Sequence, residues 1–298
     1  MLVKPFHKKL KVGQTSLLPL NIDGFTIWGK AEFMNPSGSV KDRPVLNILE
    51  WGFKMGYLNQ GDTVIEATSG NTGISFAMYC AQMGLKCVIV MPSNMSEERK
   101  KILGFYGAEL IEVEAGNFDG AIKLRDKLAE RNGWFNGNQF AHPKNLEAHY
   151  KGTGVELLYQ CKWEGFVPTA FVAGTGTGGT LMGAGKLLKE QFIEMDIVAV
   201  EPSESPVMSG GEPGLHGIQG IGDGSKFMVD LEFVDKIITI STQEATDMAL
   251  RLAKEFGLFV GISAGANVLG ALRYCEETGN NNVITILCDR GERYLSCI

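Results

Sequence analysis

The chain has 298 residues, of which 44% are hydrophobic and 21% are charged, and its formal net charge is −6. This composition is typical of globular proteins, and the length suits one large domain or two lobes that share a core. The mildly acidic balance argues against a nucleic-acid-binding surface, and no apolar run reaches the roughly 18 residues that a membrane helix needs.

The six cysteines are scattered along the chain, and none forms a CxxC pair. This spacing argues against a structural zinc site and against a disulfide framework, so we expect reduced thiols and no metal site. The opening residues MLVKPFHKKLKVGQ have neither a continuous apolar stretch nor a small-residue cleavage site, which argues against a secretory signal. We therefore expect a cytoplasmic protein.

Short β-rich runs alternate with stretches of helical spacing. The predicted strands are FTIWGKAEF (25–33), TVIEAT (63–68), CVIVMP (87–92), AELIEVEA (108–115), AFVAGTG (170–176), DIVAVEP (196–202) and VITILCD (283–289). The predicted helices include residues 45–54, 72–83, 118–131, 146–161 and 245–256. This alternation predicts an α/β fold with mostly parallel sheets that are buried on both faces. The stretch 202–227 is rich in Gly, Ser and Pro and too long for a plain connector, so we predict a functional loop.

The turn after the strand at 170–176 has the sequence Gly174-Thr-Gly-Thr-Gly-Gly-Thr180, with four glycines and three threonines in seven residues. Between a strand and a helix, such a turn lets backbone N–H groups close on a phosphate. Its glycines also match G-x-G-x-x-G, with Glu201 at the end of the next strand, so an NAD-dependent dehydrogenase is a competing interpretation. No Walker A loop is present.

The turn Thr68-Ser-Gly-Asn-Thr-Gly73 follows the strand at 63–68 and leads into a predicted helix. It offers small hydroxyls, an amide and backbone N–H groups, which suit a carboxylate better than a dinucleotide. Helix capping by Thr68 or Ser69 explains one such residue but not the whole set. The two turns together predict one site for a phosphate and another for a small carboxylate.

The stretch NPSGSVKDR places Lys41 at the start of a predicted helix. The positive end of the helix dipole disfavours a cation there and favours a neutral, nucleophilic amine. A phosphate site, a carboxylate site and a reactive lysine together indicate pyridoxal phosphate held as a Schiff base, with an amino acid as substrate.

The motifs NPSGSVKDR, TSGNTG, GTGTGGT, GISAGAN and DRGERYL closely resemble those of the cysteine synthase (O-acetylserine sulfhydrylase) family. The resemblance runs from about Leu18 to the end of the chain. It implies a fold-type II, tryptophan synthase β-like α/β fold with two lobes, each with a mostly parallel twisted sheet flanked by helices. Residues 36–145 would form a smaller mobile lobe with the carboxylate loop, and residues 1–35 and 146–298 a larger lobe with the phosphate loop. The cofactor, pyridoxal 5′-phosphate, would lie between the lobes.

The resemblance also assigns roles by position. Lys41 would form the Schiff base and take the Cα proton of the substrate, while Ser263 would face the pyridine nitrogen of the cofactor. The phosphate and the 3′ oxygen of the cofactor would be bound by Gly176, Thr177, Gly178, Gly179, Thr180 and Asn71. The substrate would be held by Thr68, Ser69, Asn71, Thr72, Gln139 and Gly220, with Ser69 also among the catalytic residues.

The resemblance implies β-replacement through an aminoacrylate, foremost cysteine synthesis from O-acetylserine and sulfide, in a homodimer. The chain departs from the family at GIGDGSKF, where Asp223 stands in place of an alanine and Ser225 in place of an aromatic residue. An aspartate between glycines also suits a solvated turn. The alternative is a carboxylate that repels hydrosulfide and assists water or another nucleophile. It predicts an L-cysteine desulfidase or desulfhydrase, which releases hydrogen sulfide by β-replacement or elimination.

Other classes stay in view at this point. A serine or threonine dehydratase would share the first half of the reaction, and a non-catalytic binding module would share only the fold. The intact Lys41 argues against the binding module.

Overall fold

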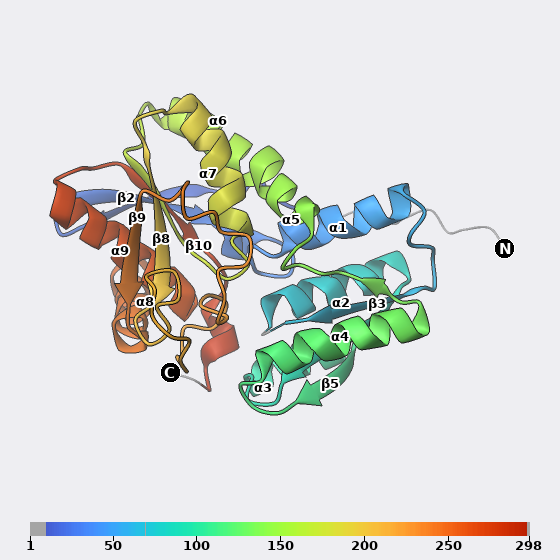
Figure 1. Ribbon diagram of the computed structural model, residues 1–298. Coiled ribbons are helices and arrows are strands. Elements are labelled where there is room, and N and C mark those ends of the chain that lie inside the picture. The colour runs from blue at the N-terminus through green and yellow to red at the C-terminus, as the bar shows by residue number, and fades with distance from the viewer. Residues whose placement is uncertain (1–9, 69, 297–298) are drawn as a thin grey trace.

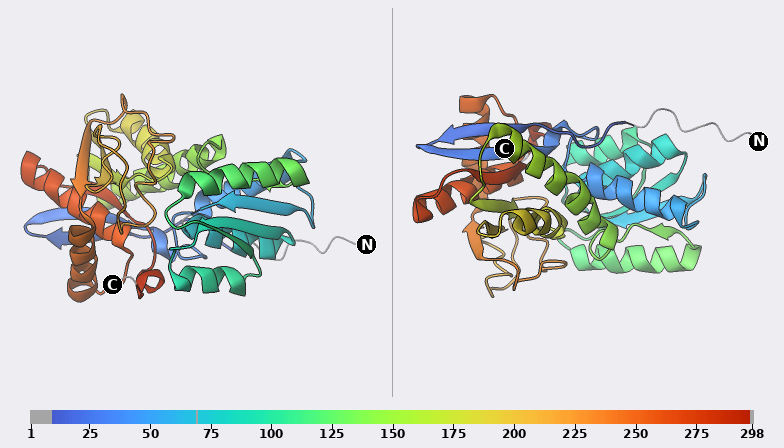
Figure 2. Two further views of the ribbon diagram at one scale, coloured as in Figure 1. Left: turned by 60° about the horizontal axis from the view of Figure 1, so that its bottom comes forward. Right: turned by 90° about the horizontal axis from the view of Figure 1, so that it is seen from above.

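The computed structural model describes residues 10–68 and 70–296 and contains two β-sheets (Figure 1). All seven predicted strands are present, and each end lies within two residues of the prediction. The predicted α/β alternation is therefore confirmed. Figure 2 shows the two sheets side by side in two further views.

The larger sheet has six strands in the order β1-β2-β10-β7-β8-β9. They are β1 (Leu17–Ile22), β2 (Phe25–Ala31), β7 (Ala170–Gly174), β8 (Asp196–Pro202), β9 (Lys236–Ile240) and β10 (Val283–Leu287). Strands β1 and β2 pair antiparallel, and every other neighbouring pair in this sheet is parallel. Strands β1 and β9 were not predicted. The β1–β2 hairpin turns at Asp23-Gly24. Both residues have positive φ (50° and 88°), as a two-residue type I′ hairpin turn requires.

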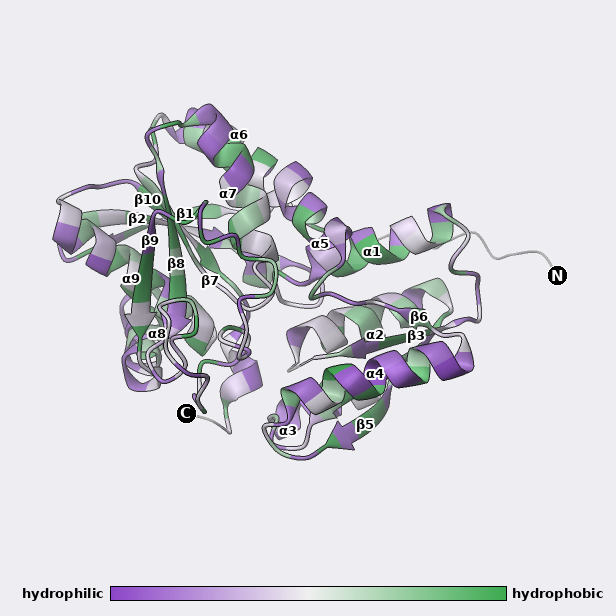
Figure 3. Cartoon of the chain, in the orientation of Figure 1, coloured by the Kyte–Doolittle hydropathy of each residue, from purple (hydrophilic) through white to green (hydrophobic). Residues whose placement is uncertain are grey.

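Alternate side chains of the six-stranded sheet enter two cores. Ala170, Val172, Val198 and Val200 face helices α8 (Thr242–Phe256) and α9 (Ile262–Thr278). Their sequence neighbours, such as Phe171 and Ile197, face α6 (Val155–Glu164) and α7 (Gly179–Gln191). Each large apolar side chain buried in this way stabilises the fold by about 1.5–3 kcal/mol. Figure 3 shows these strands as hydrophobic.

The smaller sheet has four parallel strands in the order β5-β4-β3-β6. They are β3 (Thr63–Ala67), β4 (Lys86–Pro92), β5 (Glu109–Val113) and the two-residue β6 (Phe135–Asn136), which was not predicted. One face packs on α1 (Asp42–Lys54), α2 (Asn71–Met83) and α3 (Glu97–Phe105), and the other on α4 (Phe118–Asn132). The sheets thus use different segments of the chain, although the exact lobe boundaries stay a prediction.

The predicted helix at 146–161 is wrong as a single element. The structure has α5 (Pro143–Ala148), a π-helical turn (His149–Gly154) and α6 in one continuous path. At Gly154 this path packs closely against α7, because a Cβ at this glycine would lie 3.1 Å from the Leu187 side chain. Short 3₁₀ helices at Glu32–Met34 and Gly291–Tyr294 complete the fold.

None of the helices in the described part of the chain is long and apolar enough to span a membrane. The same residues contain no group of three or more His, Cys, Asp or Glu side chains that could hold a metal ion.

Candidate active site

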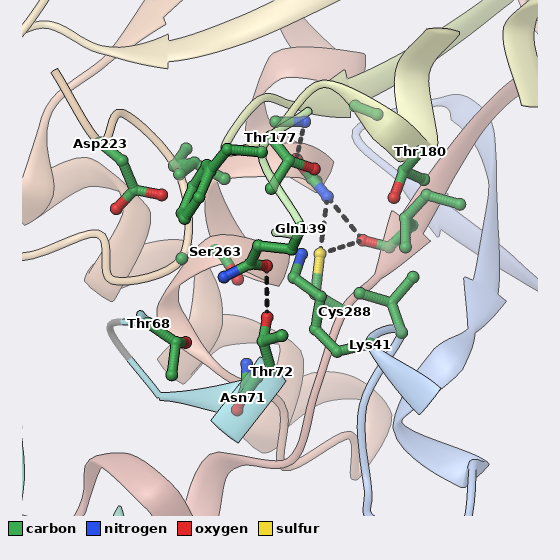
Figure 4. A pocket seen from close by; sticks show the side chains of 18 residues that line it. Lys41, Thr68, Asn71, Thr72, Gln139, Thr177, Thr180, Asp223, Ser263 and Cys288 are labelled. Atoms are coloured by element: carbon green, nitrogen blue, oxygen red, sulfur yellow. Dashed lines mark hydrogen bonds between the residues drawn. The ribbon is translucent and has the colours of Figure 1, made fainter. Parts of the chain in front are cut away.

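A cavity lies where loops of both sheets meet (Figure 4). The ends of three parallel strands lead into it, since Thr68 follows β3, Gly174 ends β7 and Cys288 follows β10. This is the edge at which ligands bind in open α/β sheets. The polar residues that line it are Lys41, Thr68, Asn71, Thr72, Gln139, Thr177, Thr180, Asp223, Ser263, Asn267 and Cys288.

Lys41 is half-buried and occupies the N-cap position of α1, which begins at Asp42. The buried carboxylate of Asp42 accepts hydrogen bonds from the Ser37 backbone N–H (2.7 Å) and the Ser75 hydroxyl (2.6 Å). Arg43 forms ion pairs with Glu32 and Glu156 (2.7 and 2.8 Å). The two residues after Lys41 are therefore fixed, and they fix the backbone from which the amine extends.

The loop before Lys41 is also tied to the end of β10. The Val40 N–H donates to the Cys288 carbonyl oxygen (2.9 Å), and Ser39 forms a β-bridge with Asp289. Lys41 and Cys288, which lie far apart in the sequence, consequently face the same cavity (Figure 4).

The loop between β3 and α2 places Thr68, Asn71 and Thr72 at the cavity, whereas Ser69 lies outside the described residues. The Thr72 hydroxyl donates a 2.6 Å hydrogen bond to Oε1 of Gln139. The Gln139 amide nitrogen donates to the Ala67 carbonyl (3.1 Å), which holds the amide against the end of β3. Neutral hydroxyl and amide groups thus converge at one helix N-terminus.

Asn71 is held by charged residues near the C-terminus. Its Nδ2 donates to Asp289 Oδ2 (2.6 Å), and its Oδ1 accepts from Arg293. The Tyr294 hydroxyl donates to the same Asp289 oxygen (2.7 Å). Asn71 therefore has one fixed orientation at the cavity wall.

The glycine-rich loop joins β7 to α7, which begins at Gly179. Among the described residues, the backbone N–H groups of Gly176, Thr177 and Gly178 have no hydrogen-bond partner. The loop has no room for side chains, since a Cβ would lie 2.6 Å from the Gly220 carbonyl oxygen at Gly176 and 2.1 Å from Asn145 at Gly179. Unpartnered N–H groups at a helix N-terminus form an anion site.

Two polar side chains hold the threonines of this loop. Asn145 Nδ2 donates to the Thr177 hydroxyl (3.0 Å), and His149 Nε2 lies 3.3 Å from the Thr180 hydroxyl. Burial, and then the charges of Arg43 and Lys41, lower the pKa of His149 well below its usual range. His149 is therefore neutral at physiological pH, and one ring nitrogen accepts while the other donates.

Asp223 belongs to the loop predicted at 202–227, which has no helix or strand after β8. The Gly222 N–H donates to the Thr175 carbonyl (2.9 Å), so this loop packs directly on the glycine-rich loop. Asp223 lines the cavity across from Cys288 and Lys41 (Figure 4). Burial raises the pKa of its carboxyl group, and the charges of Lys41 and His216 oppose that increase.

Sequence comparisons agree with this arrangement. A model of the family described as "Pyridoxal-phosphate dependent enzyme" matches residues 8–289. The chain belongs to this family. It is 46% identical over 273 residues to a cysteine synthase of Staphylococcus aureus (strain N315), covering 91% of this chain and 87% of that protein. It is 41% identical to cysteine synthase B of Campylobacter jejuni, covering 97% of both chains.

A structural relative is the hydrogen sulfide-producing enzyme of Fusobacterium nucleatum, solved as an aspartate-to-asparagine mutant with an α-aminoacrylate intermediate. Its TM-score is 0.92 at 38% identity, covering 96% of this chain and 88% of that one. The fold-type II prediction and the predicted cofactor, pyridoxal phosphate, are thereby confirmed.

The site of this pyridoxal-phosphate dependent enzyme fits its cofactor. The unpartnered N–H groups of the glycine-rich loop suit a phosphate, and the Lys41 amine lies across the cavity as a partner for an aldehyde. Of the residues predicted for the site, the cavity lining includes Lys41, Thr68, Asn71, Thr72, Gln139, Thr177, Thr180, Gly220, Asp223 and Ser263. Gly176, Gly178 and Gly179 lie in the glycine-rich loop itself.

Two polar cavity residues were missed. Asn267 on α9 accepts from the Gly174 N–H (2.7 Å) and donates to the Ile286 carbonyl (2.8 Å). These two hydrogen bonds connect α9 to the ends of β7 and β10. Cys288 lies 3.3 Å from the Asn267 amide nitrogen. A signal for Asn267 was available, because an amide in a helix of small apolar residues needs buried partners. Cys288 gave no signal beyond an apolar strand.

Proposed function

We propose that this enzyme catalyses β-replacement on a serine-derived amino acid and makes cysteine from O-acetylserine and sulfide. The observation that carries the proposal is the meeting of Lys41, the neutral side chains of Thr68, Asn71 and Thr72, and the glycine-rich loop around one cavity. The cysteine synthases of S. aureus and C. jejuni, at 46% and 41% identity, support the choice of reaction.

Bound pyridoxal phosphate supplies the electron sink that lets an amino acid lose its Cα proton and its Cβ leaving group. Gly176, Gly178 and their neighbours would hold its phosphate, Asn71 its 3′ oxygen and Ser263 its pyridine nitrogen. A neutral hydroxyl at Ser263 would not hold a proton on that nitrogen, which would favour β-elimination and β-replacement over transamination. The Lys41 amine would hold the cofactor and would take the Cα proton of the substrate.

The substrate α-carboxylate would bind at Thr68, Ser69 and Thr72 with Gln139, where hydroxyl and amide donors converge. The Thr72–Gln139 hydrogen bond (2.6 Å) orients both side chains before the substrate arrives. Gly220 would border the substrate side chain from the loop that carries Asp223. This orientation keeps the reacting Cα and Cβ near Lys41.

Two experiments test the cofactor and the reaction. The purified protein is expected to be yellow, and Lys41→Ala to lose the visible absorption of the lysine-bound cofactor; an unchanged spectrum would contradict the assignment. O-acetylserine, O-phosphoserine, cysteine and serine are then assayed as donors against sulfide, water and thiols. Undetectable cysteine formation at saturating O-acetylserine and sulfide would rule out the synthase.

Asp223 favours a second candidate, the release of hydrogen sulfide from L-cysteine with water as the incoming nucleophile. A carboxylate in the cavity repels hydrosulfide and accepts a proton from water. The F. nucleatum enzyme carries its α-aminoacrylate in an aspartate-to-asparagine mutant, which is expected where an aspartate assists the step that consumes the intermediate. Equal release of hydrogen sulfide by wild type and Asp223→Ala would exclude this role.

We also propose a homodimer, a cytoplasmic location and a smaller lobe, residues 36–145, that closes over the bound substrate. The homodimer and the lobe follow from the family resemblance, and the location from the scattered cysteines, which suit a reducing compartment. Light scattering after gel filtration tests the dimer, and cell fractionation tests the location. Small-angle scattering with and without a non-reacting amino acid tests closure.

A further inference from the structure

Arg99 on α3 is a buried cation that forms no ion pair with a carboxylate in the described part of the chain. Its side chain is 1% exposed. Its contacts are neutral: the Ser96 hydroxyl (3.3 Å), the Gln219 amide oxygen and the Tyr294 ring, whose centroid lies 4.5 Å away. Its Nε has no hydrogen-bond partner in the described structure.

A buried charge without a counter-ion is costly, and so is a buried donor without an acceptor. Arg125, another buried arginine, does not share this property, since its guanidinium forms a 2.9 Å ion pair with the buried carboxylate of Glu66. The contrast indicates that Arg99 is completed by a group that residues 10–68 and 70–296 do not supply.

The position of Arg99 indicates what that group is. A Cβ placed on Gly70 would lie 2.3 Å from both Cδ and Nε of Arg99, so the Arg99 side chain packs directly against Gly70 in the loop between β3 and α2. That loop presents hydroxyl and amide donors to the cavity but no charge of its own. The unpaired cation and the uncharged anion site are therefore in direct contact.

We propose that Arg99 is the counter-charge for the α-carboxylate of an amino-acid substrate bound at residues 68–72, and that it makes the site specific for acids over amides. The inference rests on the proposed function, because it assumes that an amino acid binds at this loop. Arg99 acts through the loop and through its charge, so it is a specificity-determining residue rather than a catalytic one.

The test compares an acid with its amide on the enzyme loaded with pyridoxal phosphate. L-alanine and L-alaninamide have no leaving group at Cβ, so each can be titrated through the visible absorption of the bound cofactor. The ratio of their Kd values is measured for wild type, R99Q, R99K and K101Q. Lys101 is an exposed residue on the same helix, so K101Q removes an equal charge away from the site.

We expect wild type and K101Q to prefer the acid equally. In R99Q the preference for the acid over the amide should fall roughly tenfold, because the buried charge is gone. R99K keeps the charge and is expected to keep most of the preference. Thermal melting and cofactor content show whether each variant is folded.

An unchanged acid-to-amide ratio in R99Q would overturn the proposal, and so would equal weakening of both ligands, which a purely structural role predicts. If R99Q does not fold, R99K decides alone, since loss of the preference despite a retained charge contradicts the proposal. If the wild type makes cysteine and R99Q keeps the wild-type acid-to-amide ratio, only this inference is overturned and the proposed function stands. A wild type that neither binds alanine nor makes cysteine overturns the proposed function as well.

Discussion

The carboxyl group of Asp223 and the amine of Lys41 line the same cavity, and the charge of Lys41 opposes the increase in pKa that burial gives Asp223. A base that assists the incoming nucleophile would thus share one enclosure with the base that removes the Cα proton. If Asp223 assists the incoming nucleophile, its protonation would decide which nucleophiles the cavity accepts.

The first prediction concerns the pH dependence of hydrogen sulfide release. Because burial raises the pKa of Asp223, its carboxylate becomes protonated at a higher pH than an exposed aspartate does. A step that needs the carboxylate should slow as the pH falls from neutral through this raised pKa. Asp223→Asn should release hydrogen sulfide more slowly and lack this dependence. Sulfide release from cysteine, followed over that range in both proteins, checks it; parallel profiles would contradict it.

Stability should change in the opposite direction. A carboxyl group whose pKa is raised in the folded state stabilises the fold only while it is protonated, and that contribution is lost as the pH rises. Asp223→Asn should therefore increase Tm near neutral pH, by up to a few degrees for roughly 1 kcal/mol. In strong acid, where the wild-type group is protonated, the two proteins should melt together. Calorimetry at both pH values measures this.

The glycine-rich loop should tolerate no side chain at Gly176. A Cβ there would lie 2.6 Å from the Gly220 carbonyl oxygen and 3.3 Å from Asp223, so Gly176→Ala must displace one of the two loops. We expect Gly176→Ala to bind pyridoxal phosphate roughly five- to a hundredfold more weakly, since overpacking of this kind costs about 1–3 kcal/mol. Cofactor release on dilution is the readout. Gly104→Ala, which has open space around it in α3, should behave as wild type.

Cys288 should be an unreactive thiol despite its place at the cavity. Burial and the nearby Asp289 raise its pKa to about 12, so its thiolate fraction at mildly alkaline pH is roughly a thousandfold below that of an exposed cysteine. Site-resolved mass spectrometry after iodoacetamide treatment should find it unmodified in the native enzyme and modified after denaturation. Rapid labelling of the native protein would contradict the pKa shift.

Much of the fold could be predicted because parallel strands are apolar along their whole length, as in CVIVMP and VITILCD. The two anion-binding turns were visible because glycine and small hydroxyl residues gather there without a packing reason. The β1–β2 hairpin was missed although Asp23-Gly24 is a typical hairpin turn, because β1 carries Pro19 and Asn21 and lacks regular alternation.

The sequence did not show which polar and charged side chains are buried in the fold. Arg99 stands in the charged run EERKK, where an arginine is usually solvated, yet it is fully buried in the fold. Cys288 follows an apolar strand, and only the chain path shows that this strand ends at a cavity. Ion pairs between distant segments, such as Arg43 with Glu156, likewise depend on packing that no local pattern reports.

The pairing of the Lys41 loop with residues 288 and 289 has a consequence for how the enzyme is made. On the ribosome, Lys41 is synthesised long before the strand end that receives the Val40 N–H. A nascent chain that stalls between the two already has the reactive amine and both anion-binding turns, yet it lacks the wall that positions the amine. The cavity is thus complete only after β10 and the residues that follow it have been synthesised.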